Sequence, residues 1–116
     1  FAQALCTNAA SLTAVANAYG YDHIFSRAVS AQGQSGDILI VLTTSGMSKN
    51  IIECVRTAND LGLITVALTG EARGTLDTLC RFVVKVPSGS TPRIQEVHLI
   101  VGHIICEMVE YELFND

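Results

Sequence analysis

Residues 43–48 carry four hydroxyl side chains and one glycine, a composition suited to binding a phosphate group. Hydroxyls and the free backbone amides of a following helix can surround a phosphate without any lysine, and the positive end of the helix dipole favours the anion. Gly46 allows the backbone to approach such a ligand closely. The alternative is that a serine only caps the helix, which requires a single hydroxyl. The candidate phosphate ligands are Thr43, Thr44, Ser45 and Ser48.

A second group of polar side chains lies on the predicted C-terminal helix. At 100° per residue, Glu96 and His103 nearly superpose, and Gln95 lies about 80° from His103. An amide, a carboxylate and an imidazole on one sector suit proton transfer or part of a metal shell. Other roles stay open, because the helix dipole favours Glu96 near an N-terminus and single histidines are often structural. The apolar neighbours of His103 predict that its imidazole is not simply solvated.

Other polar residues have two interpretations each. Arg93 could bind a phosphate or a carboxylate, or pair with Glu96 across one helical turn. Asn17 could contact a ligand or serve as a turn or cap residue. His23 and His98 align with no other polar side chain, so they are weaker candidates. The sequence contains no P-loop, dinucleotide-binding or nucleophile-elbow motif.

The hydrophobic pattern predicts the elements that position these residues. Residues 38–42 form a continuous apolar run, which is typical of a central parallel strand covered on both faces. Ligands of open α/β sheets bind beyond the carboxyl ends of such strands, where residues 43–48 lie. The alternating pattern predicts right-handed βαβ crossovers and a single doubly wound α/β domain over residues 1–116. The other expected strands cover residues 1–5, 63–68 and 82–86, and the expected helices residues 11–18, 21–32, 49–61, 76–79 and 93–113.

Composition limits the classes of partner. The formal net charge of −4 argues against binding a nucleic-acid backbone through bulk charge. No apolar run approaches the ~20 residues that cross a bilayer, so no transmembrane segment is expected. The chain is 49% hydrophobic and 16% charged, against roughly 25% charged in an average soluble domain. We therefore expect apolar surface to be buried against other subunits.

The cysteines and the first residues carry two further expectations. Four cysteines without a CxxC pair lie in apolar stretches, which predicts reduced, buried thiols in a cytoplasmic protein (Cys6, Cys54, Cys80 and Cys106). The sequence begins at Phe1 without a methionine or a signal-peptide pattern. We expect a chain that lacks its original N-terminal part.

Two segments resemble the sugar isomerase (SIS) domain, and specifically its phosphoheptose isomerase branch. They cover residues 36–48 and 90–98, and shorter matches at residues 14–17, 24–27 and 66–70 extend the similarity over nearly the whole chain. The resemblance implies a flavodoxin-like, three-layer αβα sandwich with a mainly parallel sheet. It also implies an isomerase that interconverts sedoheptulose 7-phosphate and D-glycero-D-manno-heptose 7-phosphate for bacterial lipopolysaccharide or other heptose glycans.

The resemblance assigns roles to the candidate residues. Gln95 and His103 would be zinc ligands, with Gln95 also contacting the substrate and His103 also acting as the catalytic acid or base. Asn17 would lie near the sugar, and the four hydroxyls of residues 43–48 would bind its phosphate. The family further implies a homotetramer with active sites between subunits. It places the partner base, a glutamate, and the remaining zinc ligands in an N-terminal segment that these 116 residues lack.

Three positions depart from the family pattern. Thr43 stands where the family has serine and Met47 where it has asparagine, so the hydroxyls are kept while the fit of the substrate changes. Ala18 replaces an acidic residue that often follows the asparagine, which removes one polar contact to the sugar.

Two non-enzymatic alternatives come from the same superfamily. A replication-initiator-associating protein shares the fold and the stretch over residues 93–96, but it lacks the late histidine. The presence of His103 therefore favours the enzyme over a non-catalytic phosphosugar-binding protein. A sugar-phosphate-sensing module of a regulator would require an attached DNA-binding domain, which this sequence does not show.

Overall fold

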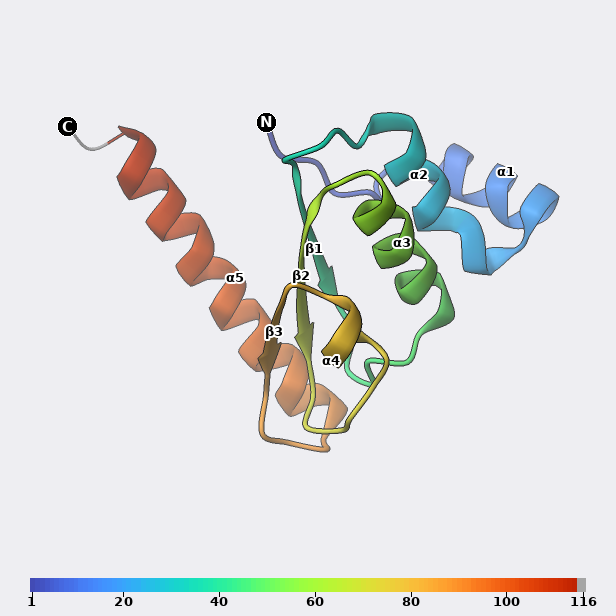
Figure 1. Ribbon diagram of the computed structural model, residues 1–116. Helices are drawn as coiled ribbons and strands as arrows, with labels where there is room; N and C mark the ends of the chain where they lie inside the picture. The colour runs from blue at the N-terminus through green and yellow to red at the C-terminus, as the bar shows by residue number, and fades with distance from the viewer. Residues whose placement is uncertain (115–116) are drawn as a thin grey trace.

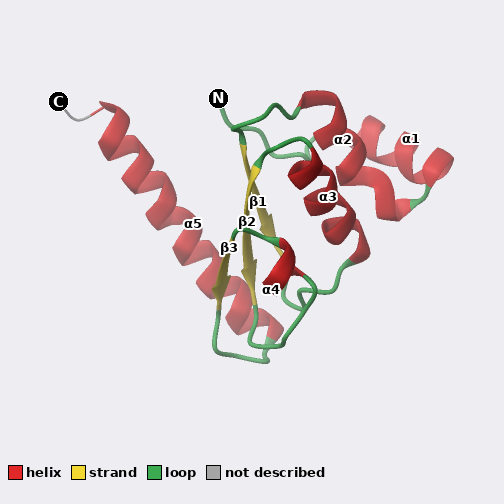
Figure 2. Cartoon of the chain, in the orientation of Figure 1, coloured by secondary structure: helices red, strands yellow, loops and turns green. Residues whose placement is uncertain are grey.

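A computed structural model describes residues 1–114 and shows helices arranged around one parallel sheet (Figures 1 and 2). The sheet contains β1 (Ile38–Leu42), β2 (Ile64–Thr69) and β3 (Phe82–Lys85), in the order β1-β2-β3 among the described residues. Val66 of β2 pairs in register with Ile40 of β1 and with Phe82 of β3. The prediction that residues 38–42 form a central strand is therefore wrong for this part of the chain, because β2 lies between the other two strands.

The helices match the predicted ones, with small changes at their ends. Asn8 begins the first helix by accepting a hydrogen bond from the Ser11 amide at 3.0 Å, and a 3-10 turn occupies the start of the predicted helix over residues 21–32. The helical elements are α1 (Ala9–Tyr19), η1 (Tyr21–His23), α2 (Ile24–Gln32), α3 (Lys49–Asp60), α4 (Leu76–Leu79) and α5 (Thr91–Phe114).

The predicted strand over residues 1–5 is wrong. A strand is stable only beside another strand that accepts and donates its backbone hydrogen bonds. Within residues 1–114 no strand pairs with this segment, and the Thr7 amide instead donates to the Ala4 carbonyl in a turn.

One face of the sheet is covered and forms the core. Side chains of a strand alternate between faces, so Leu39 and Val41 of β1 share a face with Ala67 of β2. Helices α2, α3 and α4 pack on this face, and each fully buried aliphatic side chain there stabilises the fold by roughly 1.5–3 kcal/mol. The helical members of the core include Val29, Cys54, Val55, Ala58 and Leu76.

The opposite face of the sheet is largely open. Ile38, Ile40 and Leu42 of β1 are 63%, 42% and 55% exposed, and Phe82 and Val84 of β3 are also exposed. Helix α5 begins on this face, crosses the sheet and extends away from it (Figure 1). The α/β sandwich with helices on both faces is confirmed, but the prediction that residues 38–42 are covered on both faces is wrong here.

The described structure also tests the expectations for thiols and membranes. Only Cys54 is buried, and burial raises the pKa of its thiol to about 12. Cys80 is half-buried, whereas Cys6 and Cys106 are exposed, so the prediction of four buried thiols is wrong; all four are free. None of the described helices combines the length and apolar character needed to span a membrane.

Candidate functional site

The loop over residues 43–48, here called the hydroxyl loop, connects the carboxyl end of β1 to the start of α3. The Thr43 amide continues the sheet pairing by donating to the Leu68 carbonyl at 3.0 Å. Gly46 has a φ of +68°, a backbone conformation that side chains with a Cβ rarely adopt. The chain therefore turns sharply at Gly46 before α3 begins.

The hydroxyl groups of this loop are organised by contacts with one another and with the backbone. The Thr43 and Ser48 hydroxyl oxygens are 3.2 Å apart and share a hydrogen bond. The Ser45 hydroxyl accepts a bond from the Met47 amide at 3.1 Å. The Ser48 side chain makes no capping hydrogen bond to α3, so the interpretation of Ser48 as a simple helix cap is wrong.

Backbone amides near these hydroxyls are free to bind a ligand. Among residues 1–114, the Ser45, Gly46 and Ser48 amides donate no hydrogen bond. The carbonyl of Ser48 receives the amides of Ile51 and Ile52, so the first turn of α3 is fully formed directly after the loop. Hydroxyls and free amides at a helix N-terminus are an arrangement that binds phosphate.

A second loop packs against the hydroxyl loop. Residues 70–75, here called the backing loop, follow the carboxyl end of β2. The Gly70 amide donates to the Thr44 carbonyl at 3.2 Å. A Cβ added to Gly74 would lie 2.7 Å from the Gly46 carbonyl oxygen, so only glycine allows this contact between the two loops.

The start of α5 reaches the same edge of the sheet. A Cβ added to Gly70 would lie 2.6 Å from the Ile94 side chain. Ile94 is buried, and Gln95 follows it on the exposed side of the helix. The structure thus brings the first turn of α5, which carries Gln95, close to the hydroxyl loop through Gly70.

The other candidates on α5 are exposed. Glu96 forms an ion pair with Arg93 at 2.7 Å, as one of the two interpretations of Arg93 predicted. His103 lies eight residues beyond Gln95, which is about 12 Å of helical rise. His103 is exposed, so the prediction that its apolar neighbours shield the imidazole is wrong for the described chain, because its side of α5 has no packing partner there.

These residues do not by themselves complete a zinc site. Gln95 and His103 offer one amide oxygen and one imidazole nitrogen, whereas zinc sites in proteins use at least three protein ligands. In the part of the chain that the structure describes, no group of three or more His, Cys, Asp and Glu side chains could hold a metal ion.

His98 is a buried residue whose importance the spacing of polar side chains did not indicate. Its side chain is 4% exposed, and its Nε2 lies 3.2 Å from the Thr69 carbonyl oxygen. Because a carbonyl can only accept, Nε2 carries the proton. His98 therefore ties α5 to the end of β2 beside both loops. A weak signal was that residues 66–70 and 90–98, which contain the two partners, both resemble the SIS family.

Asn17 is not brought to the hydroxyl loop. It is exposed in the last turn of α1. That helix packs mainly on η1 and α2 and lies at the outer edge of the helical layer (Figure 1). The proximity of Asn17 to a bound sugar remains a prediction.

A cavity of about 440 Å³ lies beside the start of α3, next to the two loops. Its wall includes basic side chains from α3 and η1 together with acidic ones, so it has no single charge sign. The lining residues are Asp22, His23, Lys49, Ile52, Glu53, Arg56 and Thr75.

Comparison with known proteins gives consistent matches. Residues 2–70 match the family model described as SIS domain. The chain is 48% identical over 113 residues to a phosphoheptose isomerase of Aneurinibacillus thermoaerophilus, covering 97% of this chain and 57% of the relative. It is 50% identical over 113 residues to a phosphoheptose isomerase of Sulfurimonas denitrificans, covering 97% and 58%.

A solved structure extends this similarity to the fold. A phosphoheptose isomerase from Francisella tularensis superposes with a TM-score of 0.89 at 40% identity, covering 91% of this chain and 57% of that chain. The chain thus spans 57% to 58% of the length of these relatives.

Proposed function

The chain belongs to the SIS domain family, and from this we propose that it is part of a phosphoheptose isomerase and carries its substrate-phosphate loop. The reaction interconverts sedoheptulose 7-phosphate and D-glycero-D-manno-heptose 7-phosphate. The observation that supports this most directly is the hydroxyl loop. It combines four hydroxyls with free amides at the N-terminus of α3.

The chemistry of the substrate assigns phosphate binding and proton transfer to different residues. The phosphate carries the negative charge, so Thr43, Thr44, Ser45 and Ser48 would fix that end of the sugar through hydrogen bonds that need no lysine. Aldose–ketose isomerisation moves a proton between adjacent carbons through an enediol, which requires acid–base groups near both carbons. His103 would exchange one of these protons, and Gln95 would orient the sugar.

The resemblance places the second acid–base group, a glutamate, in an N-terminal segment, whereas Glu96 on α5 forms an exposed ion pair with Arg93. The proposal therefore requires a group from another subunit or from another part of the full-length protein. A zinc ion, when bound, would polarise the sugar carbonyl. Gln95 and His103 supply only two ligands to such a site.

We also expect the protein to work as a homotetramer in the cytoplasm, with sites between subunits and a role in making heptose for surface glycans. The exposed apolar side chains on the sheet and on α5 support an assembly, since such surface is costly in water. The exposed position of His103 supports a site that a second subunit completes.

The test is turnover of sedoheptulose 7-phosphate by the full-length gene product, followed by NMR detection of the aldose. His103→Ala should lower kcat by at least ~10²-fold, the usual lower scale for a positioned acid or base. Ser45→Ala combined with Ser48→Ala should weaken sugar-phosphate binding by about 1–3 kcal/mol through lost bonds to a charged group.

Three outcomes would oppose the proposal. Binding of the sugar phosphate without turnover would favour a non-catalytic phosphosugar-binding protein. Normal turnover by the folded His103→Ala variant would remove His103 from the mechanism. Unchanged affinity of the double serine variant would move the phosphate site away from the hydroxyl loop.

A further inference from the structure

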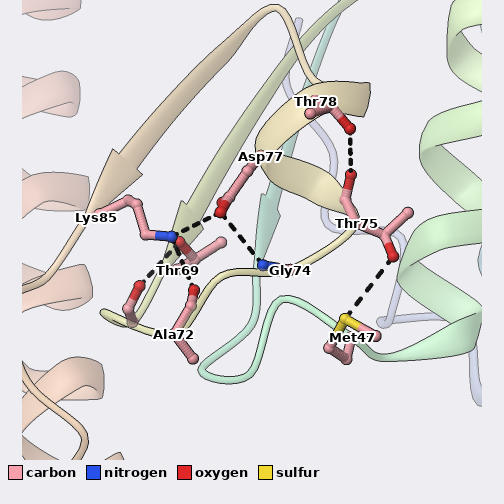
Figure 3. A network of polar contacts seen from close by, with 9 residues as sticks. Met47, Thr69, Ala72, Gly74, Thr75, Asp77, Thr78 and Lys85 are labelled. Carbon is pink, nitrogen blue, oxygen red and sulfur yellow. Dashed lines mark hydrogen bonds and ion pairs between the residues drawn. The ribbon is translucent and has the colours of Figure 1, made fainter.

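The backing loop is held in place by one ion pair between two elements. Lys85 lies at the end of β3, and its Nζ is 2.8 Å from Asp77 Oδ2 of α4. The same Nζ donates to the Ala72 carbonyl at 2.7 Å, and the Gly74 amide donates to Asp77 Oδ2 at 3.2 Å (Figure 3). Ala72 in the middle of the backing loop and Gly74 near its end are thereby tied to the same two side chains.

This ion pair differs from the others in the described chain. Arg56 with Glu53 and Arg93 with Glu96 join neighbouring turns of a single helix. The side chains of Lys85 and Asp77 are 33% and 25% exposed, whereas those of Arg93 and Glu96 are 64% and 56% exposed. Hydrogen bonds from Lys85 and Gly74 also hold the pKa of the Asp77 carboxyl below its usual range. The folded structure therefore favours the charged form of Asp77.

The loop that this pair holds is in direct contact with the hydroxyl loop. Gly74 packs on the backbone of Gly46 so closely that a Cβ would not fit. The Thr75 hydroxyl lies 3.7 Å from the sulfur of Met47 (Figure 3). Because Gly46 and Met47 lie between Ser45 and Ser48, a shift of the backing loop would displace the hydroxyls and amides that face a phosphate.

We propose that Lys85 and Asp77 are positioning residues for the phosphate site, acting through Gly74 and Gly46. Neither side chain contacts the hydroxyl loop directly. The pair fixes the position of the backing loop, and Gly74 of that loop packs against the sharp turn at Gly46. The inference deepens the proposed function and rests on it for the identity of the ligand, but the mechanical link between the two loops can be measured without any ligand.

The experiment compares Lys85→Met, Asp77→Asn and Lys85→Arg in the full-length protein. Arg81→Met is the matched control, because it removes an exposed cation directly before β3, at the opposite end of the strand from Lys85, and leaves the backing loop untouched. The first measurement is hydrogen exchange, without ligand, of the amides that hold the two loops: Thr43, Met47 and Gly70. The second is KM and kcat for sedoheptulose 7-phosphate, with inorganic phosphate as a competing ligand.

We expect exchange of the hydrogen-bonded Thr43, Met47 and Gly70 amides to quicken in Lys85→Met and Asp77→Asn. KM for the sugar phosphate and the inhibition constant of phosphate should rise about threefold to tenfold, with kcat within about twofold of wild type, since a displaced binding loop weakens binding before chemistry. Lys85→Arg should keep the exchange rates, KM and the inhibition constant near their wild-type values, because its guanidinium can reach the same two acceptors. The control should match wild type.

Exchange and KM that stay at wild-type values in Lys85→Met would overturn the inference. Failure of Lys85→Arg to restore them would also overturn it, because the effect would then be a general loss of stability. If Lys85→Met does not fold, Asp77→Asn becomes the deciding variant. It removes the charge that attracts Lys85, while its amide oxygen can still accept the hydrogen bond from Gly74. Absence of turnover in the wild type would refute the proposed function alone, and the exchange data would still decide whether the pair positions the loop.

Discussion

His98 connects the longest helix to the central strand through one hydrogen bond to the Thr69 carbonyl. The same carbonyl accepts the Val86 amide at 2.9 Å, so a single oxygen joins β2, the end of β3 and α5. Since Gln95 lies one turn before His98, this bond also sets the rotation of the helix that presents Gln95.

Two substitutions of His98 separate the contribution of its hydrogen bond to stability from the contribution of its side-chain volume. His98→Leu should lower the free energy of unfolding by about 0.5–1.5 kcal/mol, the usual net contribution of a hydrogen bond. His98→Gln keeps an N–H donor and should lose less. Urea denaturation of the full-length variants measures the difference, and equal stability of the two variants would show that the hydrogen bond contributes nothing.

For individual residues, the sequence indicated which side chains could bind a ligand better than it indicated which side chains contact one another. Residues 43–48 could be identified because all four hydroxyls follow one strand. The contacts of Lys85 with Asp77 and of His98 with Thr69 join different elements, and no periodic pattern marks them in advance. The exposure of His103 was predicted wrongly because apolar neighbours in sequence do not show whether a helix face has a packing partner.

Among the elements, a buried hydroxyl joins β2 to the helices on either side of it in the chain. Thr65 is 1% exposed and donates to Asn59 Oδ1 at 3.0 Å, while its oxygen accepts the Arg81 amide at 3.1 Å. Asn59 in turn donates to the Leu79 carbonyl at 2.9 Å. The end of α3, the start of β2 and the turn after α4 therefore share one polar network.

Thr65→Val should lower the free energy of unfolding by about 1–3 kcal/mol, because it removes two part-buried hydrogen bonds, each worth roughly 0.5–1.5 kcal/mol, at nearly constant volume. Thr65→Ser keeps the hydroxyl and is the matched control. Chemical denaturation followed by circular dichroism gives both values. A valine variant as stable as the serine variant would contradict the prediction.

Element types were predictable because periodicity reports which side of a helix or strand is apolar. The helices and the strands β1 to β3 all occur where the sequence predicted them, within a few residues. Residues 1–5 were assigned wrongly, because composition cannot show whether a neighbouring strand exists. The place of β1 at the edge of the described sheet was missed for the same reason. Its apolar run indicates a strand buried on both faces, but it does not show which strands or helices lie next to it.

At the scale of the described molecule, the open sheet face and α5 both expose large apolar side chains. Ile38, Ile40 and Leu42 face solvent from the sheet, and Ile104 and Met108 are 48% and 63% exposed on α5. A single monomer rarely exposes this much contiguous apolar surface. We expect other parts of the assembly to cover it.

Static light scattering of the full-length protein at micromolar concentration should therefore show an oligomer. Met108→Glu should weaken association by at least about tenfold, because a carboxylate would be buried without a partner. Glu110→Gln on the same helix is the control and should leave the mass unchanged. A monomeric wild type, or full assembly of Met108→Glu, would contradict this expectation.

The order of the strands also governs when each contact can form during synthesis. Each strand pairs with the strand made just before it, Ile38 with Ile64 and Val66 with Phe82, so the loops to be closed are short and their entropic cost is modest. A nascent chain can complete β1, α3 and β2 while β3 is still inside the ribosome. Of the described elements α5 emerges last, and within residues 1–114 it buries only Ile94 and His98, so its other apolar side chains are available to pack against a neighbouring chain.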